Sequence, residues 1–555
     1  MAIAVLGLVL APAASAARPP ADPVLTAISQ ALAAKNVTPA KAATYRRAWA
    51  DSARAIRTAR SKDRRSNIAA VRSYATTLAR RRGLTAPRLE QVFLSIRATT
   101  TVLNSRRAFP RHEQELRIPR DPLVYTYYAG RGVQYQPFET FKLGVSYLAA
   151  EPAKLGAARQ LADRMLELGT TDRGSLTWEF FFPFGGPATP WRSTIAQALG
   201  LRMYSLLAQQ TTDPTQQARY LAAADAIVQS FARTPAARGV SVPEGDGSFY
   251  VMYSFNPAQR ILNGHLQALL SLERYVAQTG SPAAQDAYER GYTAVVPMLP
   301  RFDTGDWSNY QPGQEADREY HAFMTDELRD LARETQDPVF TDYARRFRIY
   351  LEDPASLGLR AVLLPSLVLP RGDAYRDTIP VRFELNKSAR VTLIIADAAG
   401  IEQQRITSRA ARGINTMYWN GLTAAGVPAP EGSYSGRFVV VDRFGRRSTT
   451  TIDLPLVIEA DTVAPVPFQA TYTDVDGGAS TQVLFNVTET ASRWYEGQLA
   501  IDGETITGVL RIKSGPITFT VSRPRAELER ATLRLVDNSG NESVTPLASV
   551  PVATP

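Results

Sequence analysis

Hydrophobic residues recur with a helical period over roughly the first two thirds of the chain and with a period of two after that. In the stretch from about residue 22 to 110, Ile68, Val71 and Leu78 fall on one helical face. Gly83, a residue type that often ends helices, follows them. The pattern predicts a helical hairpin or small helical bundle in this region.

From about residue 119 to 355, helical patterns alternate with long loops rich in aromatic residues. Leu161, Met165 and Leu168 mark one of the helices. The loops read TWEFFFPFGGPATPWRS, VPEGDGSFYVMYSFNP and RFDTGDWSNYQPGQEADREYH. Helical hairpins whose loops carry Trp, Tyr, Arg and acidic residues predict an (α/α) barrel or toroid with a groove at one end. An irregular bundle whose loop aromatics only pack inward is the alternative.

In the last third of the chain the hydrophobic pattern has the period of β-strands. Val381, Phe383 and Leu385 alternate with other residues, and Gly-rich turns follow at strand spacing. This pattern predicts an immunoglobulin-like sandwich over residues 366–458 and a second all-β sandwich over 461–555. The predicted fold class is therefore multidomain, with a mainly α domain of (α/α) barrel or toroid type followed by two all-β immunoglobulin-like sandwiches.

The first 16 residues, MAIAVLGLVLAPAASA, are apolar and end in small residues. Ala14-Ser15-Ala16 fits a signal-peptidase site, so residues 1–16 are predicted to be a signal peptide. About ten apolar residues before Pro12 are too few to span a bilayer, and no later segment has the ~18 uninterrupted apolar residues of a transmembrane helix. The protein is therefore expected to be exported, either secreted or held in the cell envelope.

Positive charge is concentrated in the predicted N-terminal helices. The chain has a net charge of +10, whereas residues 41–120 alone hold about 20 Arg or Lys and about five Asp or Glu. In an exported protein, such a region suits an acidic polysaccharide or an anionic envelope surface better than nucleic acid. A solvated helical face that binds nothing is the alternative interpretation.

Several kinds of chemistry have no residues to carry them. The chain has no cysteine and only three histidines, which excludes disulfides and a Cys nucleophile and argues against a zinc site. The sequence contains no Gly-rich phosphate loop, His-x-x-x-His motif or Gly-x-Ser-x-Gly elbow. We therefore expect neither a metal nor a cofactor.

Several stretches resemble, in order and spacing, the C-terminal domain of D-glucuronyl C5-epimerases, which convert glucuronate to iduronate in heparosan-type chains. The stretches are FETFKLGVSYL, PWRSTIAQALGLRMYSLL, FYVMYSFNP, ILNGHLQALLSLERY, AYERGYTAVVPMLPRFDTGDWSNY, REYH and DPVFTDYARRFRIYL. The resemblance covers about residues 120–352. It implies an (α/α) barrel that binds an acidic polysaccharide and needs neither a cofactor nor a metal.

The resemblance assigns the family's catalytic tyrosines to Tyr253, Tyr310 and Tyr320. Tyr320 is followed by His321, as in the family's Tyr-His pair. The glutamate that precedes the first tyrosine in the family, and is held to act in proton transfer, is Met252 here. This departure supports a non-catalytic alternative.

The reaction that the resemblance implies is removal of the C5 proton, which lies α to the uronate carboxylate, and its return on the opposite face. Such a step needs a base, an acid, and a cation or donor for the negative charge that develops. Tyrosine can serve as the base or the acid if nearby cations lower its pKa from about 10. The candidate cations, each in or next to a motif loop, are Arg192, Arg260 and Arg318.

The same loops supply further candidates for substrate binding. Trp191, Tyr250 and Trp307 offer aromatic rings, a residue type that stacks on sugar rings, although packing at the rim is the alternative. His321 is a candidate for orienting Tyr320 and, with equal weight, for a purely structural role.

Residues from about 366 to 458 resemble the immunoglobulin-like module named after flagellar hook-capping proteins. Trp419-Asn420-Gly421 and Gly432-x-Tyr434 carry this resemblance. Such modules commonly end secreted bacterial enzymes, so this one fits the predicted export.

Three functions remain open on the sequence. The first is an exported uronate C5-epimerase, an isomerase that acts on a heparosan-like or other glucuronate-containing polysaccharide. The second is a polysaccharide lyase, which removes the same proton and then eliminates the 4-linked sugar. The third is a non-catalytic glycan-binding envelope protein. The expected partner in each case is an acidic polysaccharide, and a second copy of the chain, as a homodimer, is a possible one.

Overall fold

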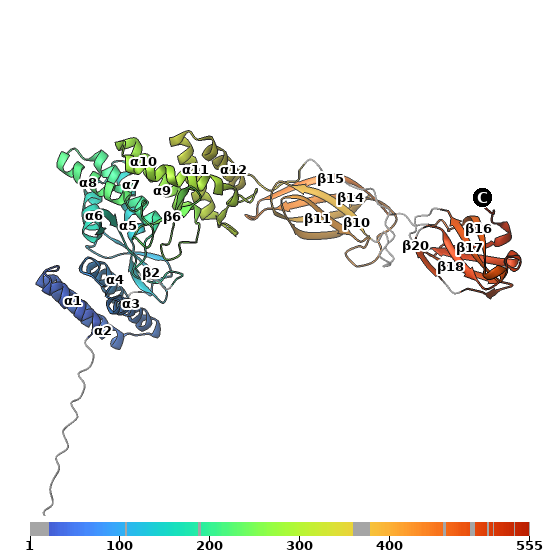
Figure 1. Ribbon diagram of the computed structural model, residues 1–555, viewed down its shortest axis with the longest axis horizontal. Coiled ribbons are helices and arrows are strands. Elements are labelled where there is room, and N and C mark those ends of the chain that lie inside the picture. The colour runs from blue at the N-terminus through green and yellow to red at the C-terminus, as the bar shows by residue number, and fades with distance from the viewer. Residues whose placement is uncertain are drawn as a thin grey trace, which may run out of the picture. The chain divides into compact units, whose positions relative to one another are not determined.

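The computed structural model describes residues 22–105, 108–186, 190–358, 378–458, 462–488, 494–507, 510–513, 515–537 and 539–553. The chain forms two compact units, Met1–Leu351 and Glu352–Pro555 (Figure 1). The predicted signal peptide, residues 1–16, lies outside the described residues.

The N-terminal helices begin where the sequence offers capping residues. They are α1 (Pro23–Ala33), α2 (Pro39–Thr58), α3 (Lys62–Arg80) and α4 (Ala86–Asn104). The side chains of Asp22, Thr38 and Ser61 accept hydrogen bonds from backbone N–H groups in the first turns of α1, α2 and α3. The rings of Tyr45 and Phe93, with centroids 4.9 Å apart, stack between α2 and α4. The hydrophobic pattern therefore predicted this region correctly as helical.

A three-stranded antiparallel sheet, which the sequence analysis did not predict, follows these helices. Its strands are β1 (Gln114–Arg117), β2 (Val124–Tyr128) and β3 (Gly132–Tyr135). The backbone N–H groups of Val133 and Tyr135 donate to Thr99 Oγ1 and Ser95 Oγ of α4 at 2.9 and 3.0 Å. These bonds fix the sheet to the N-terminal helices.

Within the described part of the first unit, eight further helices form hairpins of the expected (α/α) type. They are α5 (Pro137–Leu148), α6 (Leu155–Leu168), α7 (Thr194–Gln210), α8 (Pro214–Val228), α9 (Leu262–Thr279), α10 (Pro282–Val295), α11 (Arg318–Thr335) and α12 (Pro338–Glu352). α7 packs against α5 and α9, and α9 packs against α11, whereas α6, α8 and α10 pack against their hairpin partners (Figure 1). None of the helices in the described ranges is long and apolar enough to cross a membrane.

Short strands and a 3-10 helix occupy the loops between these helices. They are β4 (Thr170–Asp172), β5 (Ser175–Thr177), β6 (Ser241–Glu244), β7 (Gly247–Tyr250), η1 (Val296–Arg301), β8 (Asn309–Gln311) and β9 (Gln314–Glu315). The three motif loops enter the N-terminal ends of α7, α9 and α11. Ile195, Met252 and Ile261 pack together there, with Tyr310 against them. The motif loops therefore meet at one end of the domain.

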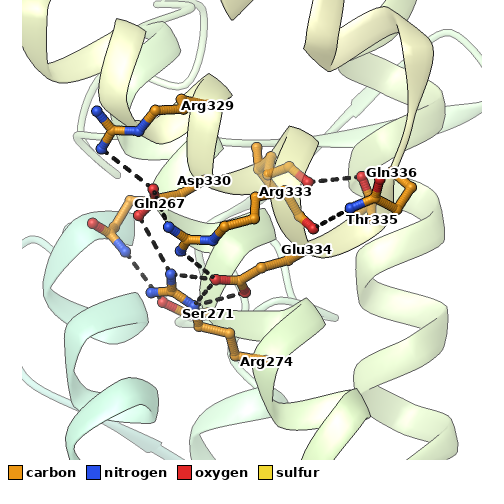
Figure 2. A network of polar contacts seen from close by, with 10 residues as sticks. Gln267, Ser271, Arg274, Arg329, Asp330, Arg333, Glu334, Thr335 and Gln336 are labelled. Carbon is orange, nitrogen blue, oxygen red and sulfur yellow. Dashed lines mark hydrogen bonds and ion pairs between the residues drawn. The ribbon is translucent and has the colours of Figure 1, made fainter.

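An arginine-centred network joins α9 to α11 (Figure 2). Arg274 donates from Nε and Nη2 to the carboxylate of Glu334 at 2.6–2.9 Å, and from Nη2 to Asp330 at 3.4 Å. Burial alone would raise the pKa of Glu334, but the hydrogen bonds and charges of Arg274 and Arg333 lower it below its ordinary value. The network is bidentate and half-buried, a geometry in which an ion pair contributes more than an exposed pair does.

One acidic side chain of α11 has no such partner. Glu327 is 3% exposed, and neither of its carboxyl oxygens has a hydrogen-bond partner among the described residues. Burial, and then the charges of Asp330 and Asp326, raise the pKa of Glu327 well above its usual value. The carboxyl group is therefore protonated at a pH where an exposed glutamate is ionised.

We expect Glu327→Gln to increase the free energy of unfolding at pH 7.5 by roughly 1–3 kcal/mol, because glutamine is neutral without taking up a proton on folding, which costs free energy at this pH. The folded-state pKa of Glu327 is raised, so the folded protein binds more protons than the unfolded chain above about pH 4. Wild-type stability should therefore fall as pH rises through that window, and the variant should lose this dependence. Denaturant unfolding at pH 5 and pH 7.5 measures both effects.

The matched control is Glu289→Gln, at an exposed position of α10. It should change stability by no more than about 0.5 kcal/mol at either pH. If the Glu327 and Glu289 variants behave alike, the buried carboxyl group is not destabilising.

The second unit begins with an all-β sandwich. Its strands are β10 (Ile379–Leu385), β11 (Ala389–Asp397), β12 (Glu402–Ala410), β13 (Gly413–Trp419), β14 (Gly432–Val441) and β15 (Arg447–Ile458). β10 pairs with β13, and β12, β11, β14 and β15 form a second sheet in that order. The Trp419 indole N–H donates to Leu422 O at 2.8 Å, and its ring lies 5.1 Å from that of Tyr434. Trp419 and Tyr434, which carry the resemblance to the immunoglobulin-like module, therefore pack in the same hydrophobic core.

A second sandwich follows, as the strand periodicity predicted. Its strands and 3-10 helices are β16 (Pro467–Val475), η2 (Asp476–Gly478), β17 (Ser480–Val487), β18 (Trp494–Ile501), β19 (Glu504–Thr505), β20 (Leu510–Lys513), β21 (Ile517–Val521), η3 (Arg525–Arg530), β22 (Ala531–Asp537), β23 (Glu542–Pro546) and η4 (Leu547–Ser549). Phe485, Leu499, Phe519 and Leu533 lie in its core. Residues 366–377 and 461, which the predicted domain ranges include, lie outside the described residues.

Candidate active site

Three tyrosines from separate parts of the chain form one cluster. Tyr253 lies in the loop between β7 and α9, Tyr310 lies on β8, and Tyr320 lies in the first turn of α11. The hydroxyl groups of Tyr310 and Tyr253 are close enough to affect each other's pKa as hydrogen-bonding partners. The rings of Tyr310 and Tyr320 have centroids 4.7 Å apart and planes inclined by 49°. The three residues that the resemblance assigned to catalysis are therefore neighbours.

The loop that carries Tyr310 is held by its own backbone and by a buried ring. Asp303 Oδ1 accepts from the Gly305 N–H at 2.7 Å, in a turn where Gly305 has φ +85°. The Trp307 indole N–H donates to Ala316 O at 2.8 Å. The Asp317 side chain then accepts from the backbone N–H of Tyr320 at 2.8 Å, which caps α11. Tyr310 and Tyr320 therefore project from rigid backbone.

His321 holds this loop against α12. Its Nδ1 lies 2.6 Å from Ser308 Oγ, and its Nε2 lies 2.9 Å from Phe347 O. A carbonyl oxygen can only accept, so Nε2 carries the proton that it donates, and Nδ1 accepts from the Ser308 hydroxyl. The imidazole ring also stacks on Trp307, with centroids 3.6 Å apart. His321 acts here as a structural residue, and both ring nitrogens are engaged away from Tyr320.

The tyrosine cluster lies in surroundings that disfavour phenolates. Burial raises the pKa of Tyr253 to about 12, against the opposing effect of the hydrogen bond from Tyr310. Burial and the two neighbouring tyrosines raise the pKa of Tyr310 well above 10. Tyr320 is 43% exposed, and burial and the charges of Asp317, Glu113 and Glu319 raise its pKa. The surroundings therefore raise the pKa of each of the three tyrosines, whereas the proposed chemistry predicted that nearby cations would lower it.

Two of the candidate cations are already paired. Arg260 donates from Nε to Glu244 Oε2 at 2.7 Å and lies over the Phe249 ring, 5.3 Å from its centroid. Arg192 is buried and hydrogen-bonded to Glu179. Arg318 is exposed in the first turn of α11, two residues before Tyr320.

Glu179 joins Arg192 to the N-terminal helices. Glu179 is 0% exposed, and Arg88 of α4 donates to its two oxygens at 2.6 and 2.9 Å. The Arg192 backbone in turn pairs with Ser254, the residue after Tyr253, at 2.8 and 3.0 Å. Burial lowers the pKa of Arg192, although the charge of Glu179 opposes this. Arg192 is therefore a link that positions the Tyr253 loop.

The aromatic candidates for substrate stacking lie inside the core. Trp191 stacks on Phe180 at 4.1 Å between centroids, and its indole N–H donates to Phe182 O at 2.7 Å. Tyr250 is fully buried, with its hydroxyl donating to the backbone oxygen of Ala287. Trp307, only 1% exposed, is covered by His321. None of these three rings offers a free face for a sugar, so the expected stacking role is corrected to packing beneath the site.

The β1–β3 sheet brings residues to the tyrosine cluster that the sequence analysis missed. Tyr128 of β2 lies 5.7 Å from Phe184, and Phe184 lies 5.5 Å from Tyr253, measured between ring centroids. Arg131, in the turn after β2, lies over Phe184, 5.6 Å from its centroid. The charge of Glu113, just before β1, acts on Tyr253, Tyr320 and Tyr128. The Gly-containing turn between the β-branched and aromatic residues of VYTYYAGRGVQY could have indicated a hairpin.

Met252 makes the floor beside Tyr253 apolar. The side chain is 7% exposed and packs with Ile195 and Ile261. A Cβ added at Gly264 of α9 would lie 2.8 Å from Met252 Cε, so the glycine leaves room for this side chain. Among the described residues, no group of three or more His, Cys, Asp or Glu side chains could hold a metal ion.

Residues 172–349 match the family model of the D-glucuronyl C5-epimerase C-terminus. Residues 373–441 match the FlgD Ig-like domain. Both resemblances found in the sequence are thereby confirmed. The epimerase match includes all three clustered tyrosines and Met252, whereas the β1–β3 sheet lies before it.

An uncharacterized protein of Methanocaldococcus jannaschii is 25% identical over 177 residues, which are 31% of this chain and 56% of that protein. The chain thus spans about half the length of that relative. Among solved structures, a cellobiose 2-epimerase from Bacillus thermoamylovorans is 11% identical over 47% of this chain and 70% of its own, with a TM-score of 0.31. An α-mannanase of Bacteroides thetaiotaomicron is 12% identical over 39% and 59%, with a TM-score of 0.27.

Glu179→Gln should lower the free energy of unfolding by about 3–5 kcal/mol, because it leaves two buried guanidinium groups without a full counter-charge. Chemical denaturation monitored by circular dichroism measures the change. The control is Glu167→Gln, at a 63%-exposed carboxylate paired with Arg164, which should cost less than about 0.5 kcal/mol.

A second variant separates the charge from the shape of this cluster. Replacing Arg88, Glu179 and Arg192 together by Met, Leu and Met removes all three charges and should restore much of the lost stability. If Glu179→Gln and Glu167→Gln are equally mild, the buried cluster does not hold the loop as described.

Proposed function

We propose that the protein is an exported uronate C5-epimerase-like enzyme that acts on a glucuronate-containing polysaccharide. The observation that carries the proposal is the convergence of Tyr253, Tyr310 and Tyr320, from two motif loops, within a segment that matches the epimerase family model. Export is proposed from the leader-like sequence at residues 1–16.

In the proposed reaction, Tyr253 removes the C5 proton as its phenolate. The C–H electron pair forms a double bond between C5 and the carboxylate carbon while the C–O π pair moves onto oxygen, which gives the aci-carboxylate; the C–O π bond re-forms when the double-bond pair takes a proton at C5 on the opposite face. Tyr310, as the hydrogen-bonding neighbour of Tyr253, donates to that phenolate and stabilises it. Tyr320, whose ring contacts that of Tyr310, is 43% exposed, so we assign it the return of a proton.

A non-catalytic glycan-binding role is the second candidate, and Met252 favours it. The family's glutamate is replaced by an apolar side chain packed against Ile195 and Ile261, which cannot transfer a proton. In that case the tyrosine cluster would bind a sugar chain without chemistry at C5.

Exchange of the C5 proton with solvent tests the proposal. The mature protein is incubated in heavy water with heparosan, and proton NMR follows loss of the C5 signal. We expect exchange by the wild type, a decrease of about 10²–10⁴-fold with Tyr320→Phe, and no decrease with Tyr147→Phe, a tyrosine of α5 outside the cluster.

The product distinguishes the candidates. Retained chains with a new C5 stereochemistry support epimerisation, and an unsaturated product that absorbs in the near ultraviolet identifies a lyase. Binding of heparosan without exchange identifies the non-catalytic candidate.

The rate should rise steeply with pH. Because the pKa of Tyr253 is raised to about 12, its phenolate fraction should increase about tenfold per pH unit through the neutral range. The kcat/KM for C5 exchange should therefore rise between pH 7 and pH 9.5 with no plateau. A bell-shaped profile centred near pH 7 would contradict the assignment of Tyr253 as the base.

A further inference from the structure

We infer that Arg131 binds a uronate carboxylate of the glycan beside the tyrosine cluster and so sets the preference for acidic chains. The inference rests on the proposed function, which supplies the glycan, and it adds the residue that recognises the acid group. Arg131 precedes the segment that matches the epimerase family model.

The turn that carries Arg131 is held firmly. The backbone N–H of Arg131 donates to Tyr128 O at 2.9 Å, and the Gln134 side chain donates to Arg131 O. The next residue, Gly132, has φ +80°, and its N–H donates to Asn67 Oδ1 of α3 at 2.9 Å. A Cβ at Gly132 would lie 2.8 Å from Val71 and 2.9 Å from Thr99, so the turn is pressed onto α3 and α4. A fixed turn presents the guanidinium group with little loss of freedom on binding.

Aromatic rings connect this guanidinium group to the proposed base. Arg131 Cζ lies 5.6 Å from the Phe184 centroid, and Phe184 lies 5.5 Å from Tyr253. Tyr74 of α3 lies on the same side, since the charge of Arg131 lowers the pKa of its hydroxyl against the raising effect of burial. A sugar chain at Tyr253 that continues over Phe184 therefore reaches Arg131 and Tyr74.

Arg131 has no ion-pair partner among the described residues. The positions omitted between residues 22 and 358, namely 106–107 and 187–189, contain no Asp or Glu. Arg192 and Arg260, by contrast, are already paired with Glu179 and Glu244. A half-buried guanidinium group over an aromatic ring is well suited to a planar carboxylate.

The charge of Glu113 adds a reason for such a cation. Besides burial, which is the main cause, the Glu113 carboxylate contributes to the raised pKa values of Tyr253 and Tyr320, and a negative charge there would also repel a uronate bound beside them. Arg131, which follows β2 of the same sheet, carries a positive charge that offsets this repulsion where the glycan extends beyond the tyrosines.

The test compares two polymers with three proteins. Calorimetry measures the affinity of wild type, Arg131→Gln and Arg117→Gln for heparosan and for carboxyl-reduced heparosan. Arg117 is an exposed residue on β1 of the same sheet, and its guanidinium group donates a hydrogen bond to Pro122 O. Arg117→Gln therefore removes one positive charge from the sheet at a different position. We expect Arg131→Gln to weaken heparosan binding about tenfold to a hundredfold and to leave binding of the reduced polymer unchanged. Arg117→Gln should change neither by more than about twofold.

Equal affinities of the two variants for heparosan overturn the inference, as does an equal loss with both polymers. C5 exchange by the wild type reports separately on the proposed function. If the wild type binds heparosan more tightly than the reduced polymer through Arg131 but does not exchange the C5 proton, the inference about Arg131 stands and the enzymatic proposal fails. If the wild type exchanges the C5 proton and Arg131→Gln has no effect on binding, the enzymatic proposal stands and the inference fails. A wild type that neither binds heparosan nor exchanges its C5 proton overturns both. Thermal unfolding of each variant checks that it is folded. Arg131→Lys, which keeps the positive charge, should recover part of the affinity for heparosan.

Discussion

The first unit depends on one buried carboxylate. Glu179 lies between Arg88 of α4 and Arg192 of the first motif loop, and the Arg192 backbone is in turn paired with the residue that follows Tyr253. A carboxylate without solvent is tolerable only because both arginines hold it, and the arginines are tolerable only because of the carboxylate. Helices near the start of the chain, a loop near its middle and the proposed base are thus joined by a single charge cluster.

Around this cluster the aromatic residues of the motif loops serve mainly to hold loops in place. Trp191 holds one motif loop through its hydrogen bond to Phe182, and Trp307 and His321 stack on each other to hold the next. Tyr253, Tyr310 and Tyr320 lie beside one another in surroundings that raise the pKa of each hydroxyl group. In the proposed reaction, a base among them must therefore lose its proton against the effect of burial.

The helices and the two sandwiches could be predicted from the sequence, because periodicity reports directly which face of an element is buried. The tyrosines could be assigned because their motifs are specific, although their contact could not. The β1–β3 sheet was missed because all three strands are short and because β2 and β3 are buried on both faces, which hides the alternation that marks a surface strand. The sequence also could not show that the indole rings of Trp191 and Trp307 are buried. It could not show that Arg192 and Arg88 both bind Glu179, because these contacts form only in the tertiary fold.

The pairing of Arg88 with Glu179 also determines where the domain can be cut. A fragment limited to the family-matched residues 172–349 would keep Tyr253, Tyr310 and Tyr320 but would lose α4, and with it one of the two arginines that neutralise Glu179. It would also lose α5, α6 and the sheet that reaches the tyrosines. The segment that matches the epimerase family model is therefore smaller than the structure that encloses Glu179, which includes α4 of the basic helices.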